Sequence, residues 1–91
     1  SPVEIENTLS GHEAVFECAV IGQRDKAGLV KPKAFVSLNE GYAANHETLV
    51  ALLQRCASEL DAHKRPRWIE FIDGLPRTAT GKVQRYKLYE H

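Results

Sequence analysis

A loop near the C-terminus combines the residue types that are best suited to binding an anionic oxygen. It reads Pro-Arg-Thr-Ala-Thr-Gly-Lys over residues 76–82. Gly81 lets the backbone turn sharply and approach a ligand, while the Thr80 hydroxyl and the compact Lys82 ammonium group suit phosphate or carboxylate oxygens. The alternative is a solvated loop with an ordinary surface lysine, because Gly-Lys pairs are common in turns.

This loop does not match the phosphate-binding P-loop motif. Six residues separate Gly74 from Gly81, which is more than the motif allows. Val83 also stands where the motif requires the Ser or Thr that binds magnesium. If the loop binds a phosphate, we expect it to use another geometry.

A second group of candidate binding residues lies at positions 63–67, which read His-Lys-Arg-Pro-Arg. Cations that alternate along a proline-stiffened segment suit a phosphate, and the flat ring of His63 could stack on a base. The side chains that we select here are His63, Arg65 and Arg67. The alternative is a solvated helix end whose cations complement the helix dipole.

No residues are spaced like the ligands of a metal ion. Cys18 and Cys56 are isolated from each other, and the histidines at 12, 46 and 91 have no second candidate ligand at suitable spacing. We therefore expect no metal site. We interpret the two cysteines as small buried apolar residues of a protein from a reducing compartment.

The composition is that of one folded domain. The chain has 91 residues, of which 43% are hydrophobic and 26% charged, enough for a single core and too few for two. Twelve Lys and Arg balance twelve Asp and Glu, which argues against nucleic-acid binding. Residues 64–91 nevertheless carry a net charge of +4, from seven cations and three anions, so we expect an anionic ligand to meet this part.

Hydropathy and the N-terminal residues indicate the cellular compartment of the protein. No stretch approaches the length of a membrane-spanning helix, and the acidic start lacks the cationic flank of a signal peptide. We therefore predict a cytoplasmic protein without membrane contact. The abrupt start, with no Met anywhere in the sequence, leads us to expect a piece of a longer polypeptide.

Two helices are predicted from caps and apolar spacing. Ser1 as N-cap and Pro2 at the first helical position predict a short helix that Gly11 ends. Asn45 is the predicted N-cap of the strongest helix, in which apolar residues recur at helical spacing. Those residues are Leu49, Leu52, Leu53, Cys56 and Leu60.

Three strands are predicted between and after these helices. Residues 15–21 and 33–38 are β-branched or apolar and are separated by polar turn residues, which predicts two adjacent strands. Residues 68–72 form a third apolar run, which predicts a third strand, and we place Trp68 in the core. Residues 84–89 are expected to form a last helical turn at the end of the chain. The order strand, helix, strand predicts a right-handed crossover with parallel pairing. The expected fold is α+β, a small mixed sheet with flanking helices.

The candidate loop belongs to a longer pattern. Residues 75–88, Leu-Pro-Arg-Thr-Ala-Thr-Gly-Lys-Val-Gln-Arg-Tyr-Lys-Leu, closely resemble the C-terminal signature of the adenylate-forming acyl-CoA synthetases. Residues 1–6 and 28–36 are similar to the start and the central strand region of that family's C-terminal domain. The amino-acid sequences of residues 28–36, 63–67 and 82–87 look most like the corresponding segments of the benzoate-CoA ligases and related aryl-CoA ligases.

The resemblance implies a mobile lid. Residues 1–91 would be the C-terminal lid domain of a two-domain ligase, with the N-terminal domain and the hinge absent from this chain. In the family, carboxylate and ATP give acyl-AMP and pyrophosphate, and coenzyme A then displaces AMP to leave a thioester. Mg²⁺ accompanies ATP and is held mainly by the N-terminal domain, so the fragment alone is not expected to be active.

Individual residues inherit roles only through this resemblance. Lys82 matches the family's catalytic lysine, and Thr80 and Gly81 lie in the loop that meets ATP and the carboxylate. His63, Arg65 and Arg67 match positions that contact the nucleotide of CoA, although the family often has Phe or Tyr where this chain has His63. The Pro-x-x-x-x-Gly-Lys pattern also resembles sites of reversible lysine acetylation, which implies a protein acetyltransferase and a deacetylase as partners of Lys82.

Two alternatives stay open at this point. The first keeps the family and changes the substrate to another acid, such as acetate or a fatty acid, because the acyl pocket of the family lies in the N-terminal domain. The second is a stand-alone module that binds a nucleotide or another anion through the basic C-terminal third.

Overall fold

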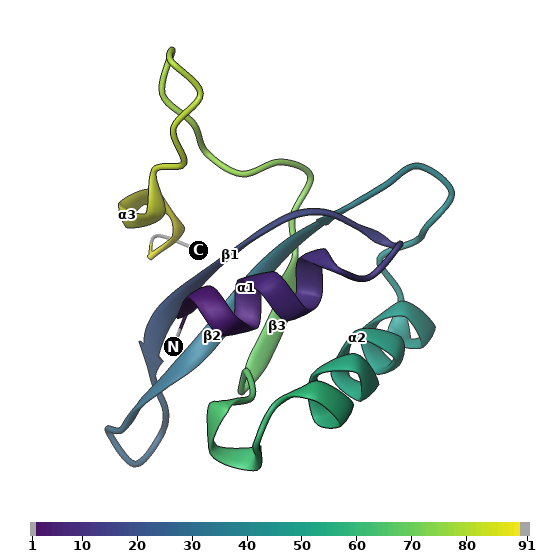
Figure 1. Ribbon diagram of the computed structural model, residues 1–91. Helices are drawn as coiled ribbons and strands as arrows, with labels where there is room; N and C mark the ends of the chain where they lie inside the picture. Colours follow the sequence, from purple (N-terminus) through teal and green to yellow (C-terminus); the bar gives the residue numbers. More distant parts are fainter. Residues whose placement is uncertain (1, 90–91) are drawn as a thin grey trace.

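The computed structural model describes residues 2–89 and is built around a three-stranded sheet (Figure 1). The elements follow in the order α1 (Pro2–Ser10), β1 (Val15–Arg24), β2 (Val30–Leu38), α2 (His46–Glu59), a 3₁₀ turn (Ala62–Lys64), β3 (Trp68–Phe71) and α3 (Arg85–Leu88). All predicted elements are present. The predicted cap at Ser1 lies outside the described residues, as does His91.

The sheet is mixed, with β2 in the centre. β1 and β2 form an antiparallel hairpin in which Val20 pairs with Ala34. β2 and β3 run parallel, with Ala34 beside Ile69, and α2 makes the crossover between them. This confirms the predicted strand neighbours and the parallel crossover. The hairpin is longer than predicted, because Gln23 and Arg24 still pair across it.

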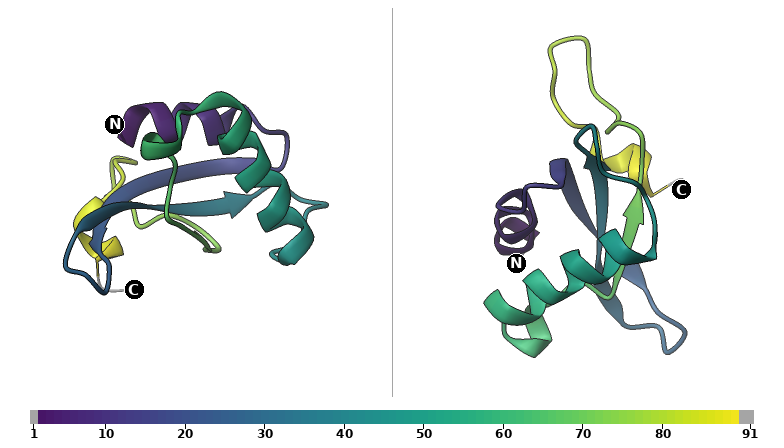
Figure 2. Two further views of the ribbon diagram at one scale, coloured as in Figure 1. Left: turned by 90° about the horizontal axis from the view of Figure 1, so that it is seen from below. Right: turned by 90° about the vertical axis from the view of Figure 1, so that its right-hand side faces the viewer.

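The two faces of the sheet carry different layers (Figure 2). α1 and α2 cover one face, and the segment that ends in α3 covers the other. The core on the α1 and α2 side includes Ile5, Leu9, Val20, Ala34, Val36, Leu52, Cys56 and Leu60. The core on the α3 side consists of Ala19, Ile21, Phe35, Leu75 and Leu88. β1 and β2 therefore bury side chains on both faces, whereas the four residues of β3 are half-buried.

A β-bulge at the start of β1 changes the side-chain alternation. The register between β1 and β2 shifts between Val15 and Glu17, so Phe16 is the extra residue and is 70% exposed. Val15 and Val20 belong to the core on the α1 and α2 side although they are an odd number of residues apart. A bulge is what allows this, since a regular strand returns to the same face only every second residue. Glu17 is thereby directed to the α3 face.

The helix α2 begins as predicted, and it buries only part of its apolar residues. The Asn45 Oδ1 atom accepts a hydrogen bond from the Thr48 backbone N–H at 2.9 Å, which confirms the N-cap. Leu52 and Cys56 are buried, whereas Leu53, another residue of the apolar repeat, is 40% exposed. A residue next to Leu52 in sequence lies about 100° around the helix from it, beyond the contact with the sheet.

Candidate functional site

The loop that carries Lys82 projects from the body of the domain as a narrow hairpin (Figure 1). Arg77 and Val83 form an antiparallel bridge at its base. The Thr78 N–H donates to the Lys82 carbonyl at 2.8 Å, and the Gly81 N–H donates to the Thr78 carbonyl at 2.9 Å. Gly81 has a φ of 90°, a conformation that favours glycine because it has no Cβ. The loop is thus a closed turn with internal hydrogen bonds.

The side chains of this turn differ in their freedom to meet a ligand. The Thr80 hydroxyl lies 3.0 Å from the Thr78 hydroxyl, and the latter also accepts the Lys82 backbone N–H at 3.1 Å. Lys82 is exposed, and no ion pair of its ammonium group occurs within residues 2–89. The backbone of Lys82 is therefore fixed while its charge remains available to an external anion.

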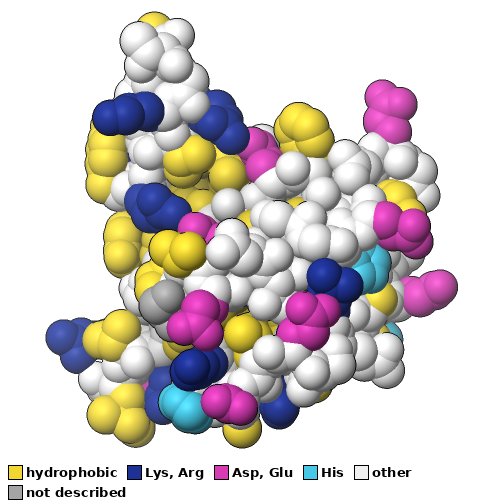
Figure 3. Space-filling view, in the orientation of Figure 1, with side chains coloured by type: hydrophobic (Ala, Val, Ile, Leu, Met, Phe, Trp, Pro, Cys, Tyr) yellow, Lys and Arg dark blue, Asp and Glu magenta, His cyan; other side chains and the backbone are white. Residues whose placement is uncertain are grey.

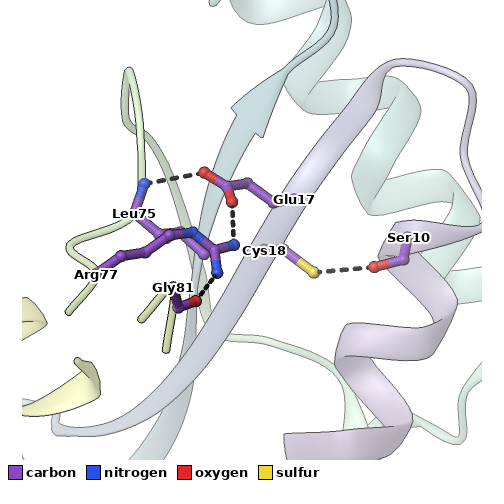
Figure 4. A network of polar contacts seen from close by, with 6 residues as sticks. All are labelled: Ser10, Glu17, Cys18, Leu75, Arg77 and Gly81. Carbon is purple, nitrogen blue, oxygen red and sulfur yellow. Dashed lines mark hydrogen bonds and ion pairs between the residues drawn. The ribbon is translucent and has the colours of Figure 1, made fainter. Parts of the chain in front are cut away.

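An arginine and a glutamate connect the turn to the sheet (Figure 4). Arg77 donates through Nη1 to the Gly81 carbonyl at 2.6 Å and through Nη2 to Glu17 Oε1 at 2.5 Å. The other Glu17 oxygen accepts the Leu75 backbone N–H at 3.0 Å. Burial alone would raise the pKa of the Glu17 carboxyl, but the hydrogen bonds from Arg77 and Leu75 outweigh it and the pKa is lowered. Glu17 is therefore ionised at neutral pH.

A second arginine pair and an apolar contact hold the rest of the segment. Arg85 Nη2 donates to Glu6 Oε2 at 2.6 Å, and the same oxygen accepts the Val20 backbone N–H at 2.8 Å. Leu88 is fully buried in the core on the α3 face. The C-terminal segment is thus attached by two arginine–carboxylate pairs and by its own hydrophobic residues.

In the second candidate group, the Arg65 side chain donates hydrogen bonds to backbone carbonyls at the C-terminal end of α2. Its Nε donates to the Leu60 carbonyl at 3.0 Å and its Nη2 to the Ala57 carbonyl at 2.9 Å. Ala57 lies in the last turn of α2 and Leu60 is its C-cap, and carbonyls at a helix end lack partners within the helix. This geometry corresponds to the helix-end alternative for Arg65.

His63 and Arg67 are exposed and face different depressions. His63 and Lys64 line a pocket of about 400 Å³ together with Ile5, Val20 and the end of the β1–β2 hairpin. Arg67 and Trp68 line another depression of about 570 Å³ with residues 23–27. The Arg67 guanidinium carbon lies 5.8 Å from the centre of the Trp68 ring, and Arg67 Nη1 lies 3.9 Å from Asp25 Oδ2. Trp68 is half-buried rather than part of the core, because it faces this depression.

The structure therefore does not bring the two candidate groups together. The loop of Thr80, Gly81 and Lys82 and the segment 63–67 lie at opposite ends of the molecule (Figures 1 and 2). In Figure 3, Lys and Arg side chains gather around the projecting loop and, separately, at the lower end. Two separate positive regions can meet two different anionic groups.

Other chemistry has little support among the described residues. Within residues 2–89, no group of three or more His, Cys, Asp and Glu side chains could hold a metal ion. Burial raises the pKa of both thiols; Cys56 is buried, while Cys18 is half-buried and its Sγ lies 3.4 Å from the Ser10 hydroxyl (Figure 4). A raised thiol pKa disfavours the reactive thiolate at neutral pH. No helix in the described part of the chain is long and apolar enough to cross a membrane.

The sequence reasoning missed the residues that hold the loop. Glu17 and Arg77 were not selected, although Glu17 is the only charged residue between positions 15 and 21. A single carboxylate in an otherwise apolar strand needs a partner, and this was the available signal. The partner itself is 60 residues away in sequence, so only the fold identifies it.

Comparisons with known proteins identify the family of the chain. The profile of the AMP-binding enzyme C-terminal domain matches residues 4–82. A benzoate–CoA ligase of Thauera aromatica is 51% identical over 88 residues, which cover 97% of this chain and 17% of that protein. A 4-hydroxybenzoate–CoA/benzoate–CoA ligase of Rhodopseudomonas palustris is 44% identical over 91 residues, covering 99% and 17%. The chain thus spans about 17% of the length of these curated relatives.

Solved structures give the same result. A crystal structure of an anthranilate CoA ligase in complex with anthranoyl-AMP superposes with a TM-score of 0.92 at 50% identity, covering 99% of this chain and 17% of the ligase. A benzoate CoA ligase from Burkholderia xenovorans gives a TM-score of 0.87 at 49% identity, covering 97% and 18%. The chain, an α+β domain with a small mixed sheet, belongs to the AMP-binding enzyme C-terminal domain family of adenylate-forming ligases.

Proposed function

We propose that residues 1–91 form the C-terminal lid domain of an ATP-dependent, AMP-forming aryl-CoA ligase. The enzyme converts an aromatic carboxylate, benzoate or a close relative, and ATP into acyl-AMP and pyrophosphate. Coenzyme A then displaces AMP and forms the thioester. The high identity to ligases that are named for benzoate and 4-hydroxybenzoate supports this substrate class.

Lys82 is the proposed catalytic residue of the first half-reaction. Its ammonium group stands on a projecting, internally bonded turn and has no partner ion within residues 2–89. When the turn enters an active site, the charge can hold the attacking carboxylate oxygen against the α-phosphorus and offset the negative charge of the transition state. Thr80 and Gly81 allow the close approach. The N-terminal domain, as the partner of this lid, supplies the acyl pocket and most contacts to ATP.

The second half-reaction is assigned to the other end of the domain. His63 and Arg67 are exposed beside depressions that could receive the nucleotide of coenzyme A. Trp68 offers a flat ring next to the Arg67 guanidinium. Arg65 is committed to α2, so we expect its contribution to CoA binding to be smaller than that of Arg67. Mg²⁺ travels with ATP, and the described residues do not fit a metal site of their own.

The decisive experiment uses the full-length ligase and separates the half-reactions. Carboxylate-dependent ATP–pyrophosphate exchange measures adenylation, and thioester formation from preformed acyl-AMP measures the second step. Lys82→Ala should lower the adenylation kcat by about 10²- to 10³-fold, the usual effect of removing one preorganised charge, and leave thioester formation nearly unchanged. Full exchange activity in Lys82→Ala would refute the catalytic assignment.

The substrate class is tested with the same exchange assay on benzoate, a hydroxybenzoate, acetate and a medium-chain acid. Preference for an aryl acid supports the proposal, and preference for acetate or the medium-chain acid replaces it with the alternative substrate. A stand-alone anion-binding module is less favoured, because the cations of residues 63–67 are divided among separate environments.

Acetylation of Lys82 is the regulatory part of the proposal. The modification removes the ammonium charge on which adenylation depends, so an acetyltransferase would switch the enzyme off and a deacetylase would restore it. The exposure of Lys82 on a projecting turn supports access by such enzymes. We place the ligase in the cytoplasm, where ATP and CoA are available and free thiols persist. Protein from a host that contains an acetyltransferase should show an acetyl mass on Lys82, and its absence would remove this part of the proposal.

A further inference from the structure

We propose that Arg77 is a positioning residue for Lys82, because its guanidinium group connects the peptide that precedes Lys82 to Glu17 on β1. The proposal rests on the adenylation role of Lys82 proposed above. Arg77 itself does not touch the substrate in this scheme. It acts through the loop backbone, and Figure 4 shows the connection.

The first step of the argument concerns the peptide group between Gly81 and Lys82. Its carbonyl oxygen accepts Arg77 Nη1 at 2.6 Å, and its N–H donates to the Thr78 hydroxyl at 3.1 Å. Because a peptide group is planar, fixing both polar atoms fixes the direction in which the Lys82 Cα leaves the turn. The carbonyl of Lys82 is held in turn by the Thr78 N–H at 2.8 Å.

The second step concerns the partner of the Arg77 guanidinium group on the sheet. Arg77 Nη2 reaches Glu17 Oε1, and Glu17 Oε2 accepts the Leu75 N–H at 3.0 Å. Glu17 comes from β1, whose pairing with the central strand makes it one of the rigid parts of the domain. Within residues 2–89, the hydrogen bonds of residues 78–82 stay inside the turn or go to Arg77, so Arg77 makes the polar connection from the turn to the sheet. Arg77 thus holds the backbone at Lys82 in a fixed position relative to the sheet.

The third step separates positioning from simple attachment. The Arg85–Glu6 pair also joins the C-terminal segment to the body, and its side chains are 51% and 17% exposed, against 43% and 16% for Arg77 and Glu17. Arg85 makes no contact with residues 77–82 among the hydrogen bonds of the described chain. Arg85→Ala is therefore a matched control that removes a similar ion pair without releasing the Gly81 carbonyl.

The experiment compares Arg77→Ala, Arg85→Ala and Lys82→Ala in the full-length ligase. Misplacing a catalytic group by about an ångström can lower a rate by about 100-fold, so we expect Arg77→Ala to lower the adenylation kcat by about 10- to 100-fold. The KM values for ATP and carboxylate, and thioester formation from preformed acyl-AMP, should change by less than about threefold. Arg85→Ala should leave both half-reactions within about threefold of wild type. Arg77→Lys should recover only part of the loss, because an ammonium group lacks the fork that spans two acceptors.

Each outcome decides between distinct conclusions. If Arg77→Ala and Arg85→Ala lower both half-reactions alike, Arg77 is only structural and the inference is wrong. If Lys82→Ala abolishes adenylation while Arg77→Ala retains it, the inference fails and the proposed function stands. If Lys82→Ala retains adenylation, the proposed function fails and the inference with it. Should Arg77→Ala not fold, Glu17→Gln weakens the same connection from the strand and must give the same selective loss of adenylation kcat.

Discussion

Replacement of Leu88 by Ala tests whether the C-terminal segment is an integral part of the fold. Leu88 is fully buried and belongs to a four-residue helix that packs against Ala19, Ile21, Phe35 and Leu75. Deleting its carbons beyond Cβ removes about 2.5 kcal/mol of transfer free energy, at about 0.8 kcal/mol for each buried carbon. The cavity left behind adds to this, so we expect a loss of about 3 kcal/mol in the free energy of unfolding.

The same substitution at Leu53 provides the control. Leu53 also lies on a helix but is 40% exposed and leaves no closed cavity. We expect Leu53→Ala to cost about 1 kcal/mol or less, since less area returns to water and Ala is a good helix former. The expected difference between the two variants is thus about 2 kcal/mol, a large part of the roughly 5–10 kcal/mol typical of a domain of this size.

Urea unfolding of the 91-residue chain measures this difference, and native-state hydrogen exchange locates it. The Leu75 and Gln84 amides, which donate to Glu17 and to the Pro76 carbonyl, report on the attachment of the segment. In Leu88→Ala their protection should fall more than that of the β1–β2 hairpin. If the two variants differ by less than about 0.5 kcal/mol, or if the Leu75 and Gln84 amides keep their protection, the segment is not packed as described.

Two other predictions concern stability. Because the pKa of Glu17 is lowered from its usual value of about 4.5, its ion pair stabilises the native state above that pH and is lost as the pH falls through the lowered pKa. The stability difference between wild type and Glu17→Gln, measured by urea unfolding, should therefore shrink below about pH 4.5; a constant difference down to about pH 3 would contradict this. Asn45→Ala should cost about 1 kcal/mol and lower Tm by about 4–8 °C in a thermal melt, whereas Asn45→Ser should retain most of the cap. Equal losses in the two Asn45 variants would show that the hydrogen bond to Thr48 is not the cause.

The elements could be predicted from sequence because their signals are local. The Asn45 cap, the turn between β1 and β2, and the apolar run of β3 are each contained within a few residues. The parallel pairing of β2 and β3 followed from the order of elements and the handedness of crossovers. The exposure of Leu53 could not be predicted, because helical spacing gives the direction of an apolar stripe but not how much of it the neighbouring elements cover.

The site was predicted less completely. Lys82 was selected from its own loop and from the family resemblance, but Glu17, to which Arg77 attaches the loop, comes from the other end of the sequence. The division of His63, Arg65 and Arg67 among separate environments was also not visible in the sequence. It depends on where the last turn of α2 ends and on which carbonyls lie within reach of Arg65. Ion pairs between distant segments follow from tertiary structure, and no spacing rule encodes them.

At the bulge in β1, deletion of Phe16 should disturb the fold more than its replacement by another residue. Phe16 is 70% exposed, and its replacement by another residue removes little buried surface. Its deletion would be different, because the residues before it would move to the opposite face and Val15 would leave the core of the α1 and α2 side. If Val15 kept its place instead, Glu17 would turn away from Leu75 and Arg77. A deletion at this exposed position therefore disturbs either the core on the α1 and α2 side or, through Glu17, the attachment of the loop of Lys82 on the other side of the sheet.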